Sequence, residues 1–147
     1  MKIEIQTDND GFALLKCQFC GDYYKLRPSD MENDVVLHIH CPYCGQVGNS
    51  YLIEEVIEVA MKMAKNFALE QIHQAFKELE RKQKRGPVTF KVGKAFQKEY
   101  ESPILLVVDA LVEQHYDCCK RNSKIKPSMK IAGTYCPFCG VKDFGDK

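Results

Sequence analysis

Three features that this sequence lacks narrow the class of protein to which it belongs. Its 147 residues carry a formal net charge of only +1, so no overall field indicates nucleic acid or a membrane as the partner. No stretch approaches the roughly 20 apolar residues of a membrane-spanning helix, and residues 1–10 lack the apolar run of a signal peptide. The sequence also lacks a glycine-rich phosphate loop, a nucleophile elbow and a His-Glu-x-x-His helix. We therefore expect a cytoplasmic protein that is not an enzyme and has no membrane partner.

The charge is small in sum but unevenly distributed along the chain. Residues 1–58 contain four Lys or Arg against ten Asp or Glu, whereas residues 59–100 contain ten against four. Residues 101–147 contain seven against six. The chain is therefore acidic at its start and basic in its middle, which permits association between these regions or a local contact with nucleic acid.

Eight cysteines are the most informative residues that the sequence does contain. Six of them form Cys-x-x-Cys pairs, each followed by Gly: Cys17/Cys20, Cys41/Cys44 and Cys136/Cys139. Two intervening residues let one tight turn present both sulfurs to a tetrahedral ion at about 2.3 Å. Backbone N–H groups of the turn can offset the thiolate charge, and the Gly supplies a positive φ. This spacing predicts a zinc site at Cys17, Cys20, Cys41 and Cys44 rather than a secreted disulfide framework.

A redox interpretation of one pair has to be weighed against metal binding. Taken alone, Cys41-Pro42-Tyr43-Cys44 looks like the active-site motif of glutaredoxins, which needs a nucleophilic Cys at a helix N-terminus. Here Gly45, Gly48 and Asn49 intervene before the next helix, and the motif recurs at residues 136–140. We therefore favour metal ligation over redox chemistry.

The end of the chain repeats its beginning. Residues 25–29, Lys-Leu-Arg-Pro-Ser, match residues 124–128, Lys-Ile-Lys-Pro-Ser, in the register that aligns Cys20 with Cys119. This register places Tyr116 where the first copy has Cys17, so one ligand is missing from its expected position. Either Cys118 or His115 can replace it, and we favour Cys118. The predicted second zinc site is thus Cys118, Cys119, Cys136 and Cys139, with His115 as the alternative ligand. A three-ligand site with an open position is less favoured because no general base stands out nearby.

A long helix is predicted between the two Cys-rich ends. Asn49 and Ser50 can cap the start of this helix, and no Pro or Gly interrupts residues 51–85. Acidic residues lie in its first turns and basic residues in its last turn, which suits the helix dipole. Apolar residues recur at helical spacing: Ile53, Ile57, Ala60, Ala64, Phe67, Ala68, Ile72, Ala75, Phe76 and Leu79. A helix of this length, roughly 50 Å, either breaks near Asn66 or pairs with a second copy.

Alternating residues predict short strands over 2–6, 12–16, 35–40 and 88–92, and the apolar run 104–108 predicts a buried strand or a helix start. His38, His40 and His73 are expected to be surface or packing residues. The predicted fold class is α+β, with two small zinc-stapled antiparallel β ribbons flanking a long central helix. The predicted domains are an N-terminal ribbon (1–49), the helix and connector (50–103) and a C-terminal ribbon (104–147).

Both ends resemble zinc ribbons, the rubredoxin-like knuckle pairs of transcription factors, RNA polymerase subunits and many phage and bacterial accessory proteins. The resemblance covers residues 12–48 and 111–141 and implies two zinc ions per chain. Such ribbons bind nucleic acid, bind protein or only staple a fold. A basic run at residues 120–126 favours a non-enzymatic protein that binds nucleic acid or a nucleic-acid-handling complex, with stacking on Phe19, Tyr23, Tyr24, Tyr43 and Phe138 or shielding of the metal by these rings. The alternative is a protein-interaction adaptor or oligomerising scaffold with structural zinc, forming a homo-oligomer through the central helix.

Overall fold

The computed structural model describes residues 5–83, 86, 88–101, 108 and 110–144. The chain divides into two compact units: a helix unit, Met1–Ile3 with Glu55–Ile104, and a ribbon unit, Glu4–Glu54 with Leu105–Lys147. Antiparallel strands and a long helix make the fold α+β, as predicted. Both Cys-rich ends lie in the ribbon unit. The three-domain division stays a prediction, because packing in one unit does not test whether each ribbon folds alone.

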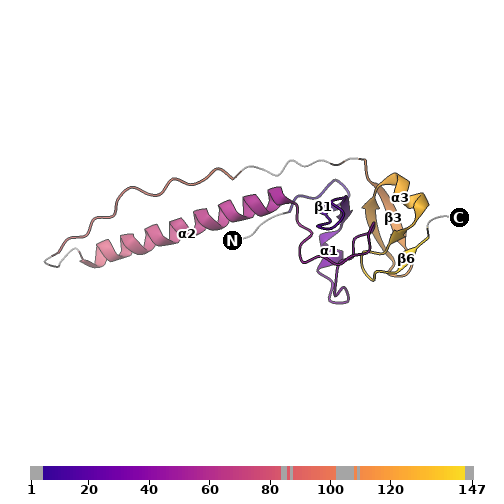
Figure 1. Cartoon of the computed structure of the whole chain (residues 1–147). Coiled ribbons are helices and arrows are strands. Elements are labelled where there is room, and N and C mark those ends of the chain that lie inside the picture. Colours follow the sequence, from indigo (N-terminus) through magenta and orange to yellow (C-terminus); the bar gives the residue numbers. More distant parts are fainter. Residues whose placement is uncertain (1–4, 84–85, 87, 102–107, 109, 145–147) are drawn as a thin grey trace. The chain divides into compact units, whose positions relative to one another are not determined.

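The ribbon unit is built on one four-stranded antiparallel sheet with the order β1-β2-β4-β3 (Figure 1). Its strands are β1 (Ala13–Lys16), β2 (Tyr23–Leu26), β3 (Val112–Tyr116) and β4 (Arg121–Ile125). Short helices follow the two hairpins, α1 (Pro28–Met31) and α3 (Pro127–Ala132), and each begins at a Pro, which suits the first helical position. A second, two-stranded sheet joins β5 (Thr134–Tyr135) to β6 (Lys142–Asp143).

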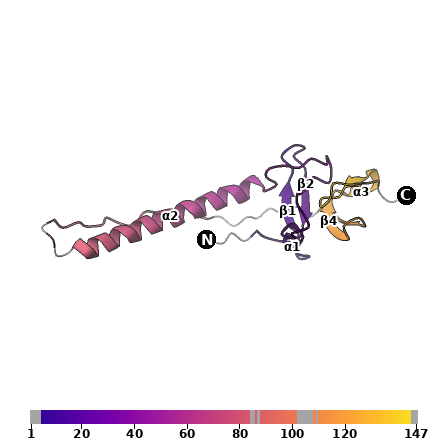
Figure 2. The same ribbon diagram turned by 90° about the horizontal axis from the view of Figure 1, so that it is seen from below.

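The two copies of the sequence repeat occupy equivalent places in this sheet. In the register that aligns Cys20 with Cys119, β1 corresponds to β3, β2 to β4 and α1 to α3. The two copies meet at the centre of the sheet, where Lys25 of β2 pairs antiparallel with its own counterpart, Lys124 of β4. Pairing of equivalent residues with each other is the property of a two-fold, self-complementary interface. The single chain therefore contains a pseudo-symmetric pair of ribbons, which confirms the repeat. Figure 2 shows the paired strands β2 and β4 beside each other.

One hydrophobic core serves both ribbons. It consists of Leu15, Cys17, Tyr24, Leu26, Ile39, Cys41, Tyr116, Cys136 and Phe138. Tyr116 stands where the first copy has a ligand, Cys17, and is completely buried. Its hydroxyl lies 3.1 Å from Thr134 Oγ1 and accepts a hydrogen bond from Ser123 Oγ at 3.3 Å. The lost ligand is thus replaced by a packed aromatic side chain whose polar atom has partners.

The helix unit contains α2 (Glu54–Gln83) apart from its first residue, and α2 is a continuous helix of 30 residues. The break near Asn66, one of the two alternatives for a helix of this length, does not occur. Instead the Asn66 side chain is buried and binds the backbone of Glu99, donating to its carbonyl and accepting from its N–H, both at 2.8 Å. Residues 88–101 therefore run back along one side of α2 (Figure 1). No helix within the described part of the chain is long and apolar enough to cross a membrane.

The strand predictions had mixed outcomes. The strand over 12–16 is confirmed as β1. Residues 35–40, all of them described, form no strand beyond a single bridge from His40 to Val47, and Val35 and Leu37 are 78% and 82% exposed. The described residues of 88–92 form no strand either, because they contact α2, with the Phe90 and Phe76 rings 6.0 Å apart. Of the strand predicted over 2–6, residues 5 and 6 form no strand and residues 2–4 lie outside the described residues. Of the apolar run 104–108, residue 108 lies in neither a strand nor a helix, and residues 104–107 lie outside the described residues.

Candidate metal centres

The first centre brings together the four cysteines predicted for it. Cys17 and Cys20 lie in the turn between β1 and β2, and Cys41 and Cys44 lie in a second tight turn. The Sγ atoms of Cys17 and Cys44 are 3.7 Å apart, and those of Cys20 and Cys41 are 3.6 Å apart. A tetrahedral zinc ion with bonds of about 2.3 Å requires sulfurs separated by about 3.8 Å. This group can therefore hold a zinc ion with little movement.

The second centre consists of Cys118, Cys119, Cys136 and Cys139, whose sulfurs all lie within 4.8 Å of one another. The Sγ atoms of Cys118 and Cys139 are 3.5 Å apart, far beyond the roughly 2.05 Å of a disulfide. All eight cysteines, which lie among the described residues, are free thiols. Two four-cysteine groups that can each hold a metal ion fit two zinc ions per chain.

His115, the alternative fourth ligand, lies outside the second group. Its Nδ1 contacts the Asn122 side-chain oxygen, and its Nε2 is 3.4 Å from Asp117 Oδ1. Asn122 in turn donates to Glu113 Oε1 at 2.6 Å. The structure thus ties His115 into a surface network and brings Cys118 into the group. The other histidines also lie outside both groups, His38 exposed and His40 and His73 half-buried.

Left-handed backbone positions shape the knuckles. Gly21, Gly45 and Gly140, which follow the second cysteines of the three Cys-x-x-Cys pairs, have φ of 74°, 73° and 74°. The repeat places Lys120 at the position of Gly21, and among the described residues Lys120 is the non-Gly residue with positive φ, 52°. The second hairpin therefore keeps the conformation of the first turn although its sequence has lost both the glycine and the Cys-x-x-Cys spacing.

Backbone N–H groups are directed at the sulfurs, as predicted for a thiolate site. The N–H groups of Phe19 and Tyr43 donate to the Sγ atoms of Cys17 and Cys41, both at 3.4 Å. Burial raises the pKa of Cys41 and of Cys136 strongly, and burial together with the Cys139 thiol raises the pKa of Cys119 to about 11. Burial opposes ionisation of Cys17 as well, but backbone N–H groups outweigh it and lower its pKa. A divalent cation would offset the cost of ionising the remaining thiols together.

The two centres are joined to each other through equivalent contacts. The His40 N–H donates to the Pro137 carbonyl and the Tyr135 N–H donates to the Pro42 carbonyl, both at 2.8 Å. Two of the knuckle glycines lie against the side chains of the same two residues. Gly45 lies against the Tyr135 ring, and Gly140 lies against the His40 ring. When Cys41 is aligned with Cys136, His40 corresponds to Tyr135 and Pro42 corresponds to Pro137. The two contacts are therefore equivalent under the pseudo-two-fold symmetry. The two metal centres are therefore parts of one pseudo-two-fold arrangement and contact each other directly.

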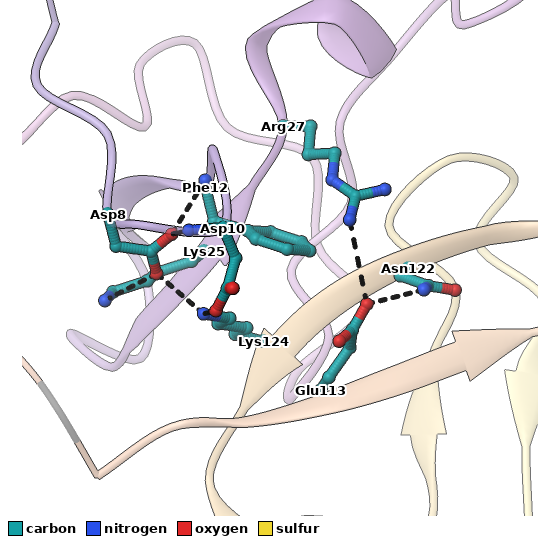
Figure 3. Close-up of polar contacts among 8 residues, drawn as sticks. All are labelled: Asp8, Asp10, Phe12, Lys25, Arg27, Glu113, Asn122 and Lys124. Atoms are coloured by element: carbon teal, nitrogen blue, oxygen red, sulfur yellow. Dashed lines mark hydrogen bonds and ion pairs between the residues drawn. The ribbon is translucent and has the colours of Figure 1, made fainter.

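Most of the ion pairs across the two ribbons use cations of the basic run 120–126, which the sequence analysis assigned to phosphate binding. Lys124 Nζ lies 2.8 Å from Asp8 Oδ2 and 2.5 Å from Asp10 Oδ2 (Figure 3). The remaining pairs are Lys126 with Asp22, Arg121 with Asp30 at 3.4 Å, and Arg27 with Glu113 at 3.9 Å. The acidic first ribbon thus binds the basic loop of the second, a contact that the sequence analysis missed.

Most aromatic side chains near the knuckles also have contacts within the protein. Lys126 lies over the Tyr43 ring and Arg121 over the Phe138 ring, 5.6 Å and 5.5 Å from the ring centroids. The Tyr43 hydroxyl donates to the Tyr23 carbonyl at 2.7 Å and accepts from the Lys126 N–H at 3.0 Å. Phe19 is the exception and is 58% exposed. These rings pack the junction between the ribbons.

The fold is α+β, and its two four-cysteine groups can each hold a metal ion, which is consistent with zinc-ribbon-like modules. Comparisons with protein-family models, with curated proteins and with solved structures found no match to this chain.

Proposed function

We propose that this chain is a non-enzymatic protein-interaction scaffold, in which two purely structural zinc ions hold the paired ribbons and the helix unit provides a binding surface. The observation that carries the proposal is the pair of complete four-cysteine groups. Four sulfurs satisfy tetrahedral zinc, whereas catalytic zinc keeps a position for water or substrate. When bound, zinc would supply folding energy here and no chemistry.

We choose a protein over nucleic acid as the partner by comparing the groups that the two units leave available on their surfaces. The cations of residues 121–126 already bind carboxylates, and three of the candidate stacking rings already lie under cations. Helix α2, by contrast, exposes large apolar side chains along its length, including Met61, Ile72 and Leu79. Exposed apolar side chains gathered on one face are typical of protein-interaction sites.

X-ray absorption at the zinc edge tests the structural role of the metal. We expect two zinc ions per chain, each with four sulfur neighbours at about 2.3 Å. An oxygen or nitrogen neighbour in either shell would reveal an exchangeable position and contradict the proposal.

Nucleic-acid binding is the second candidate, and one observation favours it. The helix unit keeps a surplus of positive charge, with Lys91 and Lys94 both exposed. A titration of labelled DNA and RNA against salt separates the two functions, because phosphate contacts weaken steeply with salt. The scaffold proposal predicts no binding at 150 mM salt (about physiological), and little difference between the natural chain and a variant with Lys91→Ser and Lys94→Ser. Tight binding that this double substitution weakens would favour nucleic acid instead.

A further inference from the structure

Helix α2 carries a straight apolar row on its surface. The row consists of Ile57, Met61, Ala64, Ala68, Ile72, Ala75 and Leu79, all of them exposed. Its spacing repeats after eleven residues, from Ile57 to Ala68 to Leu79. Eleven residues in three turns match the pitch of an α-helix closely, so the row stays on one face of α2 for most of its length.

Among the described residues of the helix unit, the returning segment 88–101 packs on another side of the helix and leaves this row uncovered. Asn66 binds the returning segment, and the backbone N–H of Val92 donates to Glu80 Oε2 at 3.4 Å. His73 lines a cavity of about 130 Å³ together with Phe96 of the same segment. At 3.6 residues per turn, Asn66, His73 and Glu80 lie on the side of α2 away from the row. The row is therefore not the surface that residues 88–101 use, and Met61 in its first half is 68% exposed.

Residue sizes along the row fit a second copy of the same helix in the opposite direction. With Ala68 at the crossing point, Ile57 meets Leu79, Met61 meets Ala75 and Ala64 meets Ile72. Two of these layers combine a large with a small side chain, and at the centre Ala68 meets its own copy, which lets the helices approach closely. A parallel pair would set Met61 against Met61 and Ala64 against Ala64.

Charge along the helix favours the same arrangement. Acids lie in the first turns at Glu54, Glu55 and Glu58, and bases in the last turn at Arg81 and Lys82. An antiparallel pair places the acidic start of one helix beside the basic end of the other and sets the helix dipoles in opposition. A parallel pair would bring like charges together at both ends.

We propose that a second copy of this chain docks antiparallel along the Ile57–Leu79 row, so that the functional form is a dimer with a metal-stapled ribbon unit on each copy. This proposal rests on the scaffold function above and names its first partner. It predicts that the full-length zinc-loaded chain has twice the chain mass in sedimentation equilibrium at micromolar concentration.

Two substitutions test the surface while leaving the metal centres untouched. Ile72→Glu places a carboxylate in the row on each copy and should weaken dimerisation at least 100-fold, roughly as for loss of an interface hot spot. Gln74→Glu adds the same charge at an exposed position away from the row and should leave the dimer intact. Circular dichroism and zinc content should be unchanged in both variants, which excludes misfolding as the cause.

A photo-crosslinking residue at position 57 tests the direction. We expect crosslinks to the peptide around residue 79 of the second copy, identified by mass spectrometry. Crosslinks back to the peptide around residue 57 would overturn the antiparallel arrangement. A concentration-independent monomer, or a dimer that Ile72→Glu does not weaken, would overturn the proposal. Failure of the scaffold function would show instead as oxygen or nitrogen in the zinc shell, so the two failures are distinguishable.

Discussion

At the scale of single residues, the second centre depends on which side chain supplies its fourth ligand. Cys118 lies 3.5 Å from Cys139 by their sulfurs, whereas His115 is held by Asn122. We predict that Cys118→Ser loses the second zinc ion, because a serine hydroxyl stays protonated at neutral pH and is a poor zinc ligand. His115→Ala should retain two ions per chain. Elemental analysis after dialysis against a weak chelator measures both, and loss of an ion in the His115 variant would contradict the assignment.

The knuckle glycines allow a matched comparison of local strain. Gly21 and Gly140 share a φ of 74°, but a Cβ added at Gly21 meets nothing within 4 Å, whereas one added at Gly140 lies 2.8 Å from Cε1 of His40. Both changes to Ala incur the left-handed backbone penalty of about 1–2 kcal/mol. Gly140→Ala should lose a further 1–3 kcal/mol, roughly, because the half-buried His40 ring has to move. Denaturant unfolding of the zinc-loaded variants measures the two losses in the free energy of unfolding. Equal losses for the two variants would show that the His40 ring can move at little energetic cost.

At the scale of elements, Asp8 holds the junction of β2 and β4. Lys25 and Lys124 pair directly across these strands, where like charges repel. The Asp8 carboxylate lies between them, 3.1 Å from Lys25 Nζ and 2.8 Å from Lys124 Nζ, and accepts the Phe12 N–H at 3.0 Å (Figure 3). Burial opposes ionisation of Asp8, but the bonds from Lys124, Phe12 and Lys25 outweigh it and hold its pKa well below the ordinary value.

Replacing this carboxylate should therefore weaken the junction between the two ribbons. We predict that Asp8→Asn lowers the free energy of unfolding by about 1.5–3 kcal/mol at pH 7. Asp10→Asn, which alters an exposed partner of the same Lys124, should lose less than about 1 kcal/mol. Because the folded pKa of Asp8 lies below the unfolded one, its contribution is complete above about pH 4 and is lost only as the pH falls further. The difference between wild type and Asp8→Asn should thus stay constant from pH 8 to pH 5, and a decrease within that window would argue against the charge mechanism.

The elements also show what could be predicted from the sequence. Helix α2 and strand β1 were predictable because local periodicity decides them. Residues 35–40 alternate like a strand, yet the His40 N–H donates to Pro137 of the other ribbon, a partner nearly 100 positions away. The cysteine groups were predictable from spacing. The pairing of the ribbons was not, because Asp8 and Lys124 are 116 positions apart and local pattern carries no information about such a contact.

At the scale of the whole molecule, the shared core makes the two metal centres depend on each other. Cys17 and Cys41 of the first centre and Cys136 of the second lie in the same buried cluster. Loss of one ion releases its knuckle cysteines from that cluster and so removes packing from the other centre. Structural zinc contributes folding free energy directly, so we expect each ion to stabilise the site of the other.

We therefore predict that a strong chelator removes both zinc ions in one transition, in which the ribbon unit unfolds. Helix α2 belongs to the other unit and should partly persist, so far-ultraviolet circular dichroism keeps a helical signal while the near-ultraviolet signal of the buried Tyr24 and Tyr116 disappears. Cys20→Ser, which alters only the first centre, should also weaken zinc binding at the second, as read by competition with a chelating dye. Two separate release steps, with the second centre unaffected by Cys20→Ser, would mean that the ribbons are independently stable in spite of their common core.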